Sequence, residues 1–237
     1  LLKDIFFVNE NIGYAAGELV QNTPIVLKTT NSGASWTQIF PTNITGFSFN
    51  SLFFKNEQVG LAVGDNGKIY KTSNGGVTWT NKSPGTSYNI NSIDCINDEC
   101  WAALHNYTTI KSSNFGDSWN YVFVNNVTGG MVVDIDFINS NVGVIATHTE
   151  DIGITCDGGL SWSGVSVDNQ LRRINSIEIL TNGTIIASGS YEHLPSLELS
   201  PAFTKLTPSN FLSDNNPCPS AYSHHLTYML EQVINNS

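Results

Sequence analysis

One short pattern recurs four times along the chain. It reads Thr/Ser-x-Asn/Asp-x-Gly-x-Ser/Thr-Trp, and its copies span residues 29–36, 72–79, 112–119 and 155–162. The Trp residues that close the four copies lie 43, 40 and 43 residues apart. A fixed period of this length is the signature of a repeat architecture, in which one structural unit is built several times. The chain is therefore expected to stack copies of one unit.

Each copy of the pattern follows two short apolar runs. In the second unit these runs are Ser51–Lys55 and Gly60–Gly64, and they are followed by Lys68–Thr72, the Gly-containing turn and Trp79–Lys82. Four short strands in about 42 residues are typical of one blade of a β-propeller. The predicted fold class is therefore all-β, a β-propeller of four-stranded antiparallel blades. The corresponding runs of the other units predict strands at residues 4–8, 13–17, 92–96, 101–104, 134–138, 143–146, 176–180 and 184–188.

Five such units fill residues 1–208, which we predict to form the propeller domain. A degenerate fifth copy of the pattern is expected at residues 196–203, with Phe203 in place of Trp. Five blades could close a ring, or the chain could be a fragment of a larger ring. We expect the larger ring, because the first residue already lies in a strand of the innermost type, so that blades would be missing upstream. Residues 209–237 break the repeat and predict a C-terminal extension with a loop and a short helix. The helix is indicated by apolar residues at helical spacing, namely Leu226, Met229, Leu230, Val233 and Ile234.

The repeated pattern resembles the Asp box of bacterial-neuraminidase-repeat propellers. The wider unit, Asn-Glu-x-x-Gly-Leu/Tyr-Ala-x-Gly followed by Lys-Thr-x-x-x-Gly-x-Ser/Thr-Trp, resembles the photosystem II assembly-factor-like repeats. Sortilin-type receptors and xyloglucanase-type glycosidases share the box. The resemblance covers residues 1–207 and implies the propeller fold, while many activities share this architecture. It also implies that the boxes lie at the blade periphery, away from the active face.

The box residues have a structural explanation. An Asn or Asp at the third position can accept backbone N–H bonds within a tight turn, and the Gly takes a backbone conformation that other residues avoid. The Trp is expected to pack between blades and to donate its indole N–H. We therefore expect a structural and not a catalytic role for the box residues, which are Asn31, Gly33, Trp36, Asn74, Gly76, Trp79, Asn114, Gly116, Trp119, Asp157, Gly159 and Trp162.

The four cysteines indicate disulfides. Cys95 and Cys100 flank an Asn-Asp turn between two predicted strands, which suits a hairpin disulfide, and similar pairs occur at this place in secreted members of the family. A metal site that includes His105 is the rival interpretation, but zinc sites usually need four clustered ligands. Cys156 could pair with Cys218, although four cysteines allow three connectivities. An even number of cysteines favours an oxidising compartment.

Six sequons permit N-glycosylation without establishing it, because a chain rich in Asn, Ser and Thr produces about this number by chance. They begin at Asn43, Asn81, Asn106, Asn126, Asn182 and Asn235. Together with the cysteines, they predict an extracellular location or the lumen of the secretory pathway.

The charge balance excludes several functions. With 10 Lys and Arg against 20 Asp and Glu, the net charge of −10 disfavours nucleic acid or an anionic membrane as partner. No apolar run reaches the roughly 18 residues of a membrane helix. A sialidase of this architecture needs three separated Arg, whereas Arg172 and Arg173 are adjacent and are the only two.

No catalytic constellation stands out in the sequence. The chain has no P-loop, no Gly-x-Ser-x-Gly and no His-Glu-x-x-His motif. A xyloglucanase-type hydrolase would need paired carboxylates at a cleft, and solvated loop acids are far commoner than catalytic ones. We therefore predict no catalytic residue, no metal and no cofactor. The loop acids in question are Asp65, Glu150, Asp151 and Glu192.

One set of residues is a candidate binding site. The residue 14 positions before the box Trp is Asp65, His105 or His148 in the second, third and fourth units. This position follows the second predicted strand, and the resemblance implies that such loops line one face of the propeller near its axis. Exposed loop residues without a function are the alternative interpretation. The predicted ligand-binding set is Glu18, Asp65, His105, Tyr107, His148 and Tyr191.

These observations support three functional hypotheses. The first is a non-enzymatic, secreted or lumenal propeller that binds a protein or glycan, or that self-assembles or serves as a subunit of a larger extracellular complex. The second is one propeller of a glycan-cleaving hydrolase of the xyloglucanase type. The third is a photosynthetic complex assembly factor, which rests on the resemblance of the repeats, while the acidic balance and the cysteine pair weigh against it.

Overall fold

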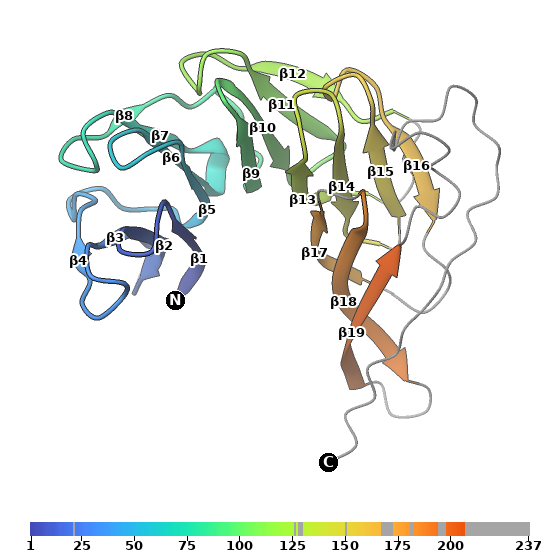
Figure 1. Ribbon diagram of the computed structural model, residues 1–237, viewed down its shortest axis with the longest axis horizontal. Helices are drawn as coiled ribbons and strands as arrows, with labels where there is room; N and C mark the ends of the chain where they lie inside the picture. Colours follow the sequence, from blue (N-terminus) through green and yellow to red (C-terminus); the bar gives the residue numbers. More distant parts are fainter. Residues whose placement is uncertain are drawn as a thin grey trace. The chain divides into compact units, whose positions relative to one another are not determined.

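A computed structural model describes residues 1–20, 22–125, 127, 130–149, 151–166, 173–180, 183–193 and 198–206 (Figure 1). Within these ranges the protein consists of 19 strands and one 3₁₀ turn, η1 (Asp65–Gly67). The strands form five sheets in which hydrogen-bonded neighbours are consecutive in the sequence. The all-β propeller prediction is therefore confirmed.

The first four sheets contain four strands each, and the fifth contains three. The first consists of β1 (Leu2–Phe7), β2 (Gly13–Leu19), β3 (Thr23–Thr29) and β4 (Thr37–Gln38). The second consists of β5 (Phe49–Phe54), β6 (Gly60–Gly64), β7 (Ile69–Thr72) and β8 (Thr80–Asn81). The third consists of β9 (Ile90–Ile96), β10 (Glu99–Leu104), β11 (Thr108–Ser112) and β12 (Asn120–Phe123). The fourth consists of β13 (Val132–Phe137), β14 (Gly143–Thr147), β15 (Asp151–Thr155) and β16 (Ser163–Ser166). The fifth consists of β17 (Arg173–Ile179), β18 (Ile185–His193) and β19 (Glu198–Leu206).

The four box turns lie where the period predicts them, between the third and fourth strand of the first four sheets. The predicted fifth box is wrong, because Phe203 lies inside β19 and pairs with Ser188 of β18. The sequence explains this difference. The segment has Glu198 where the boxes have Asn or Asp and Ser200 where they have Gly, so it lacks the two residues that hold the turn. The C-terminal extension, 209–237, and its predicted helix lie outside the described residues.

The chain divides into two compact units. The first comprises residues 1–105 and 110–121, and the second comprises residues 106–109 and 122–237. In the first unit, one buried cluster joins the first and second sheets and another joins the second and third. At the first of these junctions, the rings of Tyr14 and Phe54 stack with centroids 3.5 Å apart. In the second unit, one cluster joins the fourth and fifth sheets. Each sheet thus buries its apolar face against the next sheet within its unit.

A β-bulge interrupts the first strand of all five sheets at the same place. In the second sheet, Phe49 pairs with Gly64 and Ser51 with Val63, so that Asn50 is the extra residue. A bulge bends its strand and re-aims a side chain. The five bulged residues are Lys3, Asn50, Asn91, Val133 and Asn175.

Candidate functional site

The Asp boxes are held together by their own side chains. In the second box, Oδ1 of Asn74 accepts hydrogen bonds from Thr72 Oγ1 at 3.1 Å and from the backbone N–H of Thr78 at 2.9 Å. The backbone N–H of Gly76, whose φ is 90°, donates to Thr72 Oγ1 at 2.9 Å. The other three boxes repeat these bonds. The motif is therefore accounted for by the turn itself, without a ligand.

Four of the six candidate binding residues occupy one repeated position. The backbone N–H of Glu18 donates to the carbonyl oxygen of Leu1 at 2.8 Å, and that of Asp65 donates to Ser48 at 2.9 Å. The same bond recurs in the next two blades, and each joins the end of a second strand to the residue just before or at the start of the first strand. The equivalent donors there are His105, to Asn89, and His148, to Met131, each at 2.8 Å.

The two units divide this set of residues. Glu18, Asp65 and His105 belong to the first unit, and His148 belongs to the second. The second unit also contains Tyr107, whose side chain is 61% exposed. The side chain of Tyr191 and the whole of Glu150 lie outside the described residues. The following description of the site concerns the first unit alone.

The carboxylate of Asp65 is held by two donors. Its Oδ1 accepts a hydrogen bond from Asn50 Nδ2 at 3.0 Å, and its Oδ2 accepts one from the backbone N–H of Ser48 at 3.3 Å. The side chain is half-buried at the start of η1. Asp65 is thus an oriented hydrogen-bond acceptor and not a freely rotating surface acid.

Asn50, the bulged residue of β5, connects three blades. Its Oδ1 accepts a hydrogen bond from Lys3 Nζ of the first blade at 2.8 Å. Its Nδ2 donates both to Asp65 of its own blade and to the backbone carbonyl of Ile90 in the third blade, the latter at 2.9 Å. This side chain therefore fixes the spacing between the ends of three successive first strands.

Asn89 connects the second and third blades in the same way. Its Oδ1 accepts a hydrogen bond from the backbone N–H of Asn66 at 3.0 Å, and its backbone oxygen accepts the bond from His105. The bulged residue Asn91 donates from Nδ2 to Nδ1 of His105 at 3.1 Å. Beside Asn89, Tyr88 is an aromatic residue with 52% of its surface exposed. Asp65 and His105 are thus brought to one polar surface of the first unit.

Sequence reasoning missed the bulged residues and Tyr88. A signal for the bulges does exist, because the tripeptide Asn-Ser-Leu/Ile occurs at residues 50–52, 91–93 and 175–177, always at the start of a first strand. At the position of Tyr88, the second unit has the buried Phe47 and the fourth has Gly130, so the repeat does not predict an exposed ring there. Only the fold shows that its loop packs against the loop that begins at Asp65.

The cysteines at the predicted hairpin are bonded. Cys95 and Cys100 lie opposite each other in β9 and β10 and form a disulfide, with Cα atoms 4.1 Å apart and both residues buried. Cys156 is also disulfide-bonded. Its predicted partner Cys218 lies outside the described residues, so that pairing stays a prediction. No group of three or more His, Cys, Asp or Glu side chains in the described ranges is arranged to hold a metal ion.

The described sequon asparagines differ in exposure. Asn43 and Asn81 are exposed, whereas Asn106 is half-buried and accepts a hydrogen bond from the backbone N–H of Thr108 at 2.9 Å. Glycosylation at these positions stays a prediction. The other three sequons, which begin at Asn126, Asn182 and Asn235, lie outside the described residues.

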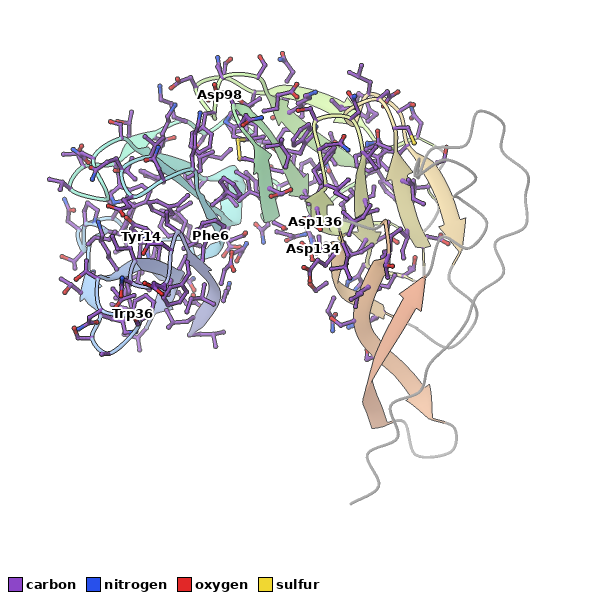
Figure 2. The ribbon with its side chains drawn as sticks, in the orientation of Figure 1. Phe6, Tyr14, Trp36, Asp98, Asp134 and Asp136 are labelled. Carbon is purple, nitrogen blue, oxygen red and sulfur yellow. A yellow bond between two sulfur atoms is a disulfide. The ribbon has the colours of Figure 1, made fainter. Side chains whose placement is uncertain are left out.

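Two carboxylates of the second unit, Asp134 and Asp136, lie on β13 (Figure 2). Asp134 accepts a hydrogen bond from the backbone N–H of Ile177 at 2.8 Å, and Asp136 accepts one from Ile179 at 2.6 Å. Burial raises the pKa of Asp136 above its ordinary value, and the nearby charges of Asp134 and Glu178 add to the rise, while the bond from Ile179 opposes it. These acids connect the first strands of two neighbouring blades, which is a structural role.

Comparison with known proteins places the chain in a family. The family described as photosynthesis system II assembly factor YCF48 matches residues 42–194, which is more than half of the chain. The chain belongs to this family. A YCF48-family relative, the photosystem II assembly lipoprotein Ycf48 of Synechococcus sp. (strain CC9902), is 25% identical over 138 residues, or 56% of the chain. The chain spans only 41% of the length of that relative.

Solved structures agree with the propeller fold. A structure of YCF48 bound to a D1 peptide has a TM-score of 0.64 and 15% identity, over 87% of this chain and 63% of that one. An ancestral GH74 enzyme has a TM-score of 0.68 and 17% identity, over 86% of this chain and 29% of the enzyme. At these identities the likeness shows the fold alone. In the described part of this YCF48-family chain, no helix is both long and apolar enough to span a membrane.

Proposed function

We propose that this chain is the propeller part of an assembly factor of the YCF48 type. In this proposal it binds a segment of another protein at the surface that carries Asp65 and His105, and it does not convert that segment chemically. The observation that carries the proposal is the family match over residues 42–194, which includes both residues and the loops around them. The hydrogen-bonded asparagines of that surface add support, because pre-oriented polar groups reduce the ordering cost of binding.

A segment of the photosystem II protein D1 is the proposed partner. The solved YCF48 structure with a D1 peptide motivates this choice. The surface of the first unit offers acceptors, an imidazole and the exposed ring of Tyr88, which suit a peptide. Loop residues on a rigid scaffold are the usual place for such binding.

This proposal reverses the order of the hypotheses drawn from the sequence. The acidic balance weighed against an assembly factor, but net charge describes the long-range field and not a local surface. The local surface carries the positive charge of Lys3, although the chain as a whole is acidic. The disulfide fits any oxidising compartment and does not separate a secreted protein from a lumenal one. We propose a lumenal compartment because the matching family is a photosystem II assembly factor, and we keep an extracellular location as the competing proposal.

The domain limits are part of the proposal. Residues 1–208 form the propeller, and residues 209–237 form an extension with a second candidate binding element, the predicted helix. The proposal assigns the D1 segment to the propeller surface and not to this helix.

Peptides that tile the D1 protein provide the test. The immobilised chain is exposed to each peptide, and Kd is measured by interferometry for the best binder. Replacing Asp65 and His105 together by Ala is expected to raise that Kd by at least about tenfold, because each lost hydrogen bond to a charged group is worth about 1.5–3 kcal/mol. The matched control is Asp98→Ala, in the turn between β9 and β10, at the opposite end of the sheet from His105.

Asp98 forms an ion pair with Lys55 at 2.6 Å, and its replacement is expected to leave Kd unchanged. Deletion of residues 220–237 is the competing variant. An unchanged Kd in the variant that lacks Asp65 and His105, together with loss of binding on deletion, would assign the partner to the extension and overturn the proposed surface.

A further inference from the structure

We infer that the bulged residue Asn50 is a positioning residue, and that Asp65 and Lys3 on either side of it bind the main chain of an extended segment, an N–H at Asp65 and a carbonyl at Lys3. This inference rests on the proposed function, because it names the chemical group that the same surface recognises.

The bulge is a built feature of this fold. It occurs at the same place in all five first strands, opposite the residue that precedes the candidate binding position. Bulges are over-represented next to binding and active sites, where they redirect a side chain. In the two blades where both side chains are described in contact, the bulged residue bonds the binding residue of its own blade, Asn50 to Asp65 and Asn91 to His105.

The repeats of this chain differ from one another at the bulge. The residues there are Lys, Asn, Asn, Val and Asn, whereas two positions later every blade has Leu or Ile. The later position is buried in the second to fifth sheets, at Leu52, Ile93, Ile135 and Ile177. The packing of the blades therefore fixes the apolar position and leaves the bulged residue free to differ between blades.

Both donor hydrogens of Asn50 are used, so it has no donor left for a ligand. Its Oδ1 accepts from Lys3, and its two Nδ2 protons go to Asp65 and to the carbonyl of Ile90. Asn50 therefore holds the ammonium of Lys3 on one side and the carboxylate of Asp65 on the other. The ammonium of Lys3 has three donor hydrogens, of which Asn50 takes one.

An extended peptide matches this pair of groups. Its main chain offers N–H donors and carbonyl acceptors at short spacing, so one N–H can meet the carboxylate while a carbonyl meets the ammonium. Recognition of the main chain leaves the side chains of the bound segment free, and Tyr88 lies in the adjoining loop as an exposed ring against which they can pack.

Backbone methylation of the peptide tests this inference. The D1 peptide that binds best is synthesised as a set in which one backbone nitrogen at a time carries a methyl group. One position is expected to raise Kd about tenfold with the wild-type chain and less than twofold with Asp65→Ala, because the methylated N–H and the carboxylate form the same bond. The variant Asn50→Ala is expected to weaken binding about fivefold and to reduce the same coupling.

The variant Asn91→Ala is the matched comparison. It removes the bulged residue of the next blade, which contacts His105, and it is expected to keep the coupling between the methylated position and Asp65. If peptides bind at this surface but the effects of methylation and Asp65→Ala are additive at every position, main-chain recognition is wrong while the proposed function stands.

A measurement without ligand tests the positioning role separately. The side-chain NH2 signals of Asn50 are expected to shift in the NMR spectrum of Asp65→Ala and of Lys3→Ala, and to stay in place in Asp98→Ala. If those signals do not move in the first two variants, Asn50 does not hold the two groups, whether or not any peptide binds.

Discussion

The indole Nε1 of Trp79 donates a hydrogen bond of 3.2 Å to the backbone carbonyl of Ile39, 40 residues earlier. Its ring also lies edge-on to Phe40 and Phe54, with centroids 5.7 and 6.3 Å away. Ile39 and Phe40 follow the outermost strand of the first blade, so the second box is attached to its neighbour. Trp36 differs, because its indole donates to Gly33 within its own box at 3.1 Å.

Trp79→Ala is therefore expected to destabilise the protein by about 3 kcal/mol, near the low end of the range for emptying a large aromatic site. Trp36→Ala is the matched variant and should cost clearly less, because no bond to another blade is lost. His105→Ala should change stability by less than about 0.5 kcal/mol, as is usual at a surface position. Urea unfolding of the three variants measures this order. Equal losses for Trp79 and His105 would mean that the box Trp does not fasten the blades.

The Cys95–Cys100 disulfide is expected to contribute little to stability for a covalent bond. The two residues are separated by five positions, and closing so short a loop is worth about 2 kcal/mol in the loop-entropy estimate. Replacing both cysteines by Ser should lower the free energy of unfolding by about that amount and leave the protein folded. Non-reducing peptide mapping of the wild-type chain should recover the linked fragment, and free thiols at both positions would contradict the assignment.

Asp136 predicts a specific dependence of stability on pH. Because its pKa in the folded chain lies above the ordinary 3.8, its protonated form favours folding. That contribution is fully present below the unfolded pKa and is lost as the pH rises through the folded pKa. Asp136→Asn can still accept the bond from Ile179 and carries no charge. It should therefore melt at a higher temperature than wild type at pH 7, and the difference should vanish at the acid end of a pH series. A pH-independent difference would assign the effect to packing.

The sequence predicts the blades well because each blade repeats a local code. Strand positions follow from apolar runs that turn residues interrupt, and the box turns follow from Asn or Asp and Gly at fixed places. The predicted start of the second blade was Ser51, whereas β5 begins at Phe49. The two extra residues include the bulge at Asn50, which disturbs the alternation of apolar and polar residues on which the prediction rests. A bulge is a mismatch between two strands, so neither strand shows it alone.

The contacts between blades cannot be predicted from the sequence of a single repeat. Oδ2 of Asp4 accepts hydrogen bonds from the hydroxyl of Ser51 and the backbone N–H of Leu52. Asp134 does the same for the N–H of Ile177 in the second unit. Nothing near these acids in the sequence names their partners, which lie more than 40 positions away. Glu18, in contrast, is assigned to the repeated position because its backbone bond to Leu1 recurs at Asp65, His105 and His148.

The fourth box is the only one of the four with a titratable residue at its third position, and it supplies the last prediction. Burial alone would raise the pKa of Asp157, but hydrogen bonds from Ser161, Thr155 and Leu160 outweigh it and lower the pKa. A depressed pKa stabilises the fold above the unfolded value of 3.8 and loses that contribution as the pH falls through the folded value.

Asp157→Asn copies the residue of the other three boxes, as at Asn74, and cannot titrate. At pH 7 it should change stability by less than about 0.5 kcal/mol, since Oδ1, which accepts from the backbone N–H of Ser161, is kept, and the new amide NH2 can donate to the Ser161 hydroxyl as Asn74 donates to Thr78. Below pH 4 it should unfold less readily than wild type, and Asn74→Asp should transfer the acid sensitivity to the second box. Melting curves from pH 7 to pH 2 measure both variants. Identical acid profiles for all three chains would show that protonation of the box carboxylate does not destabilise the fold.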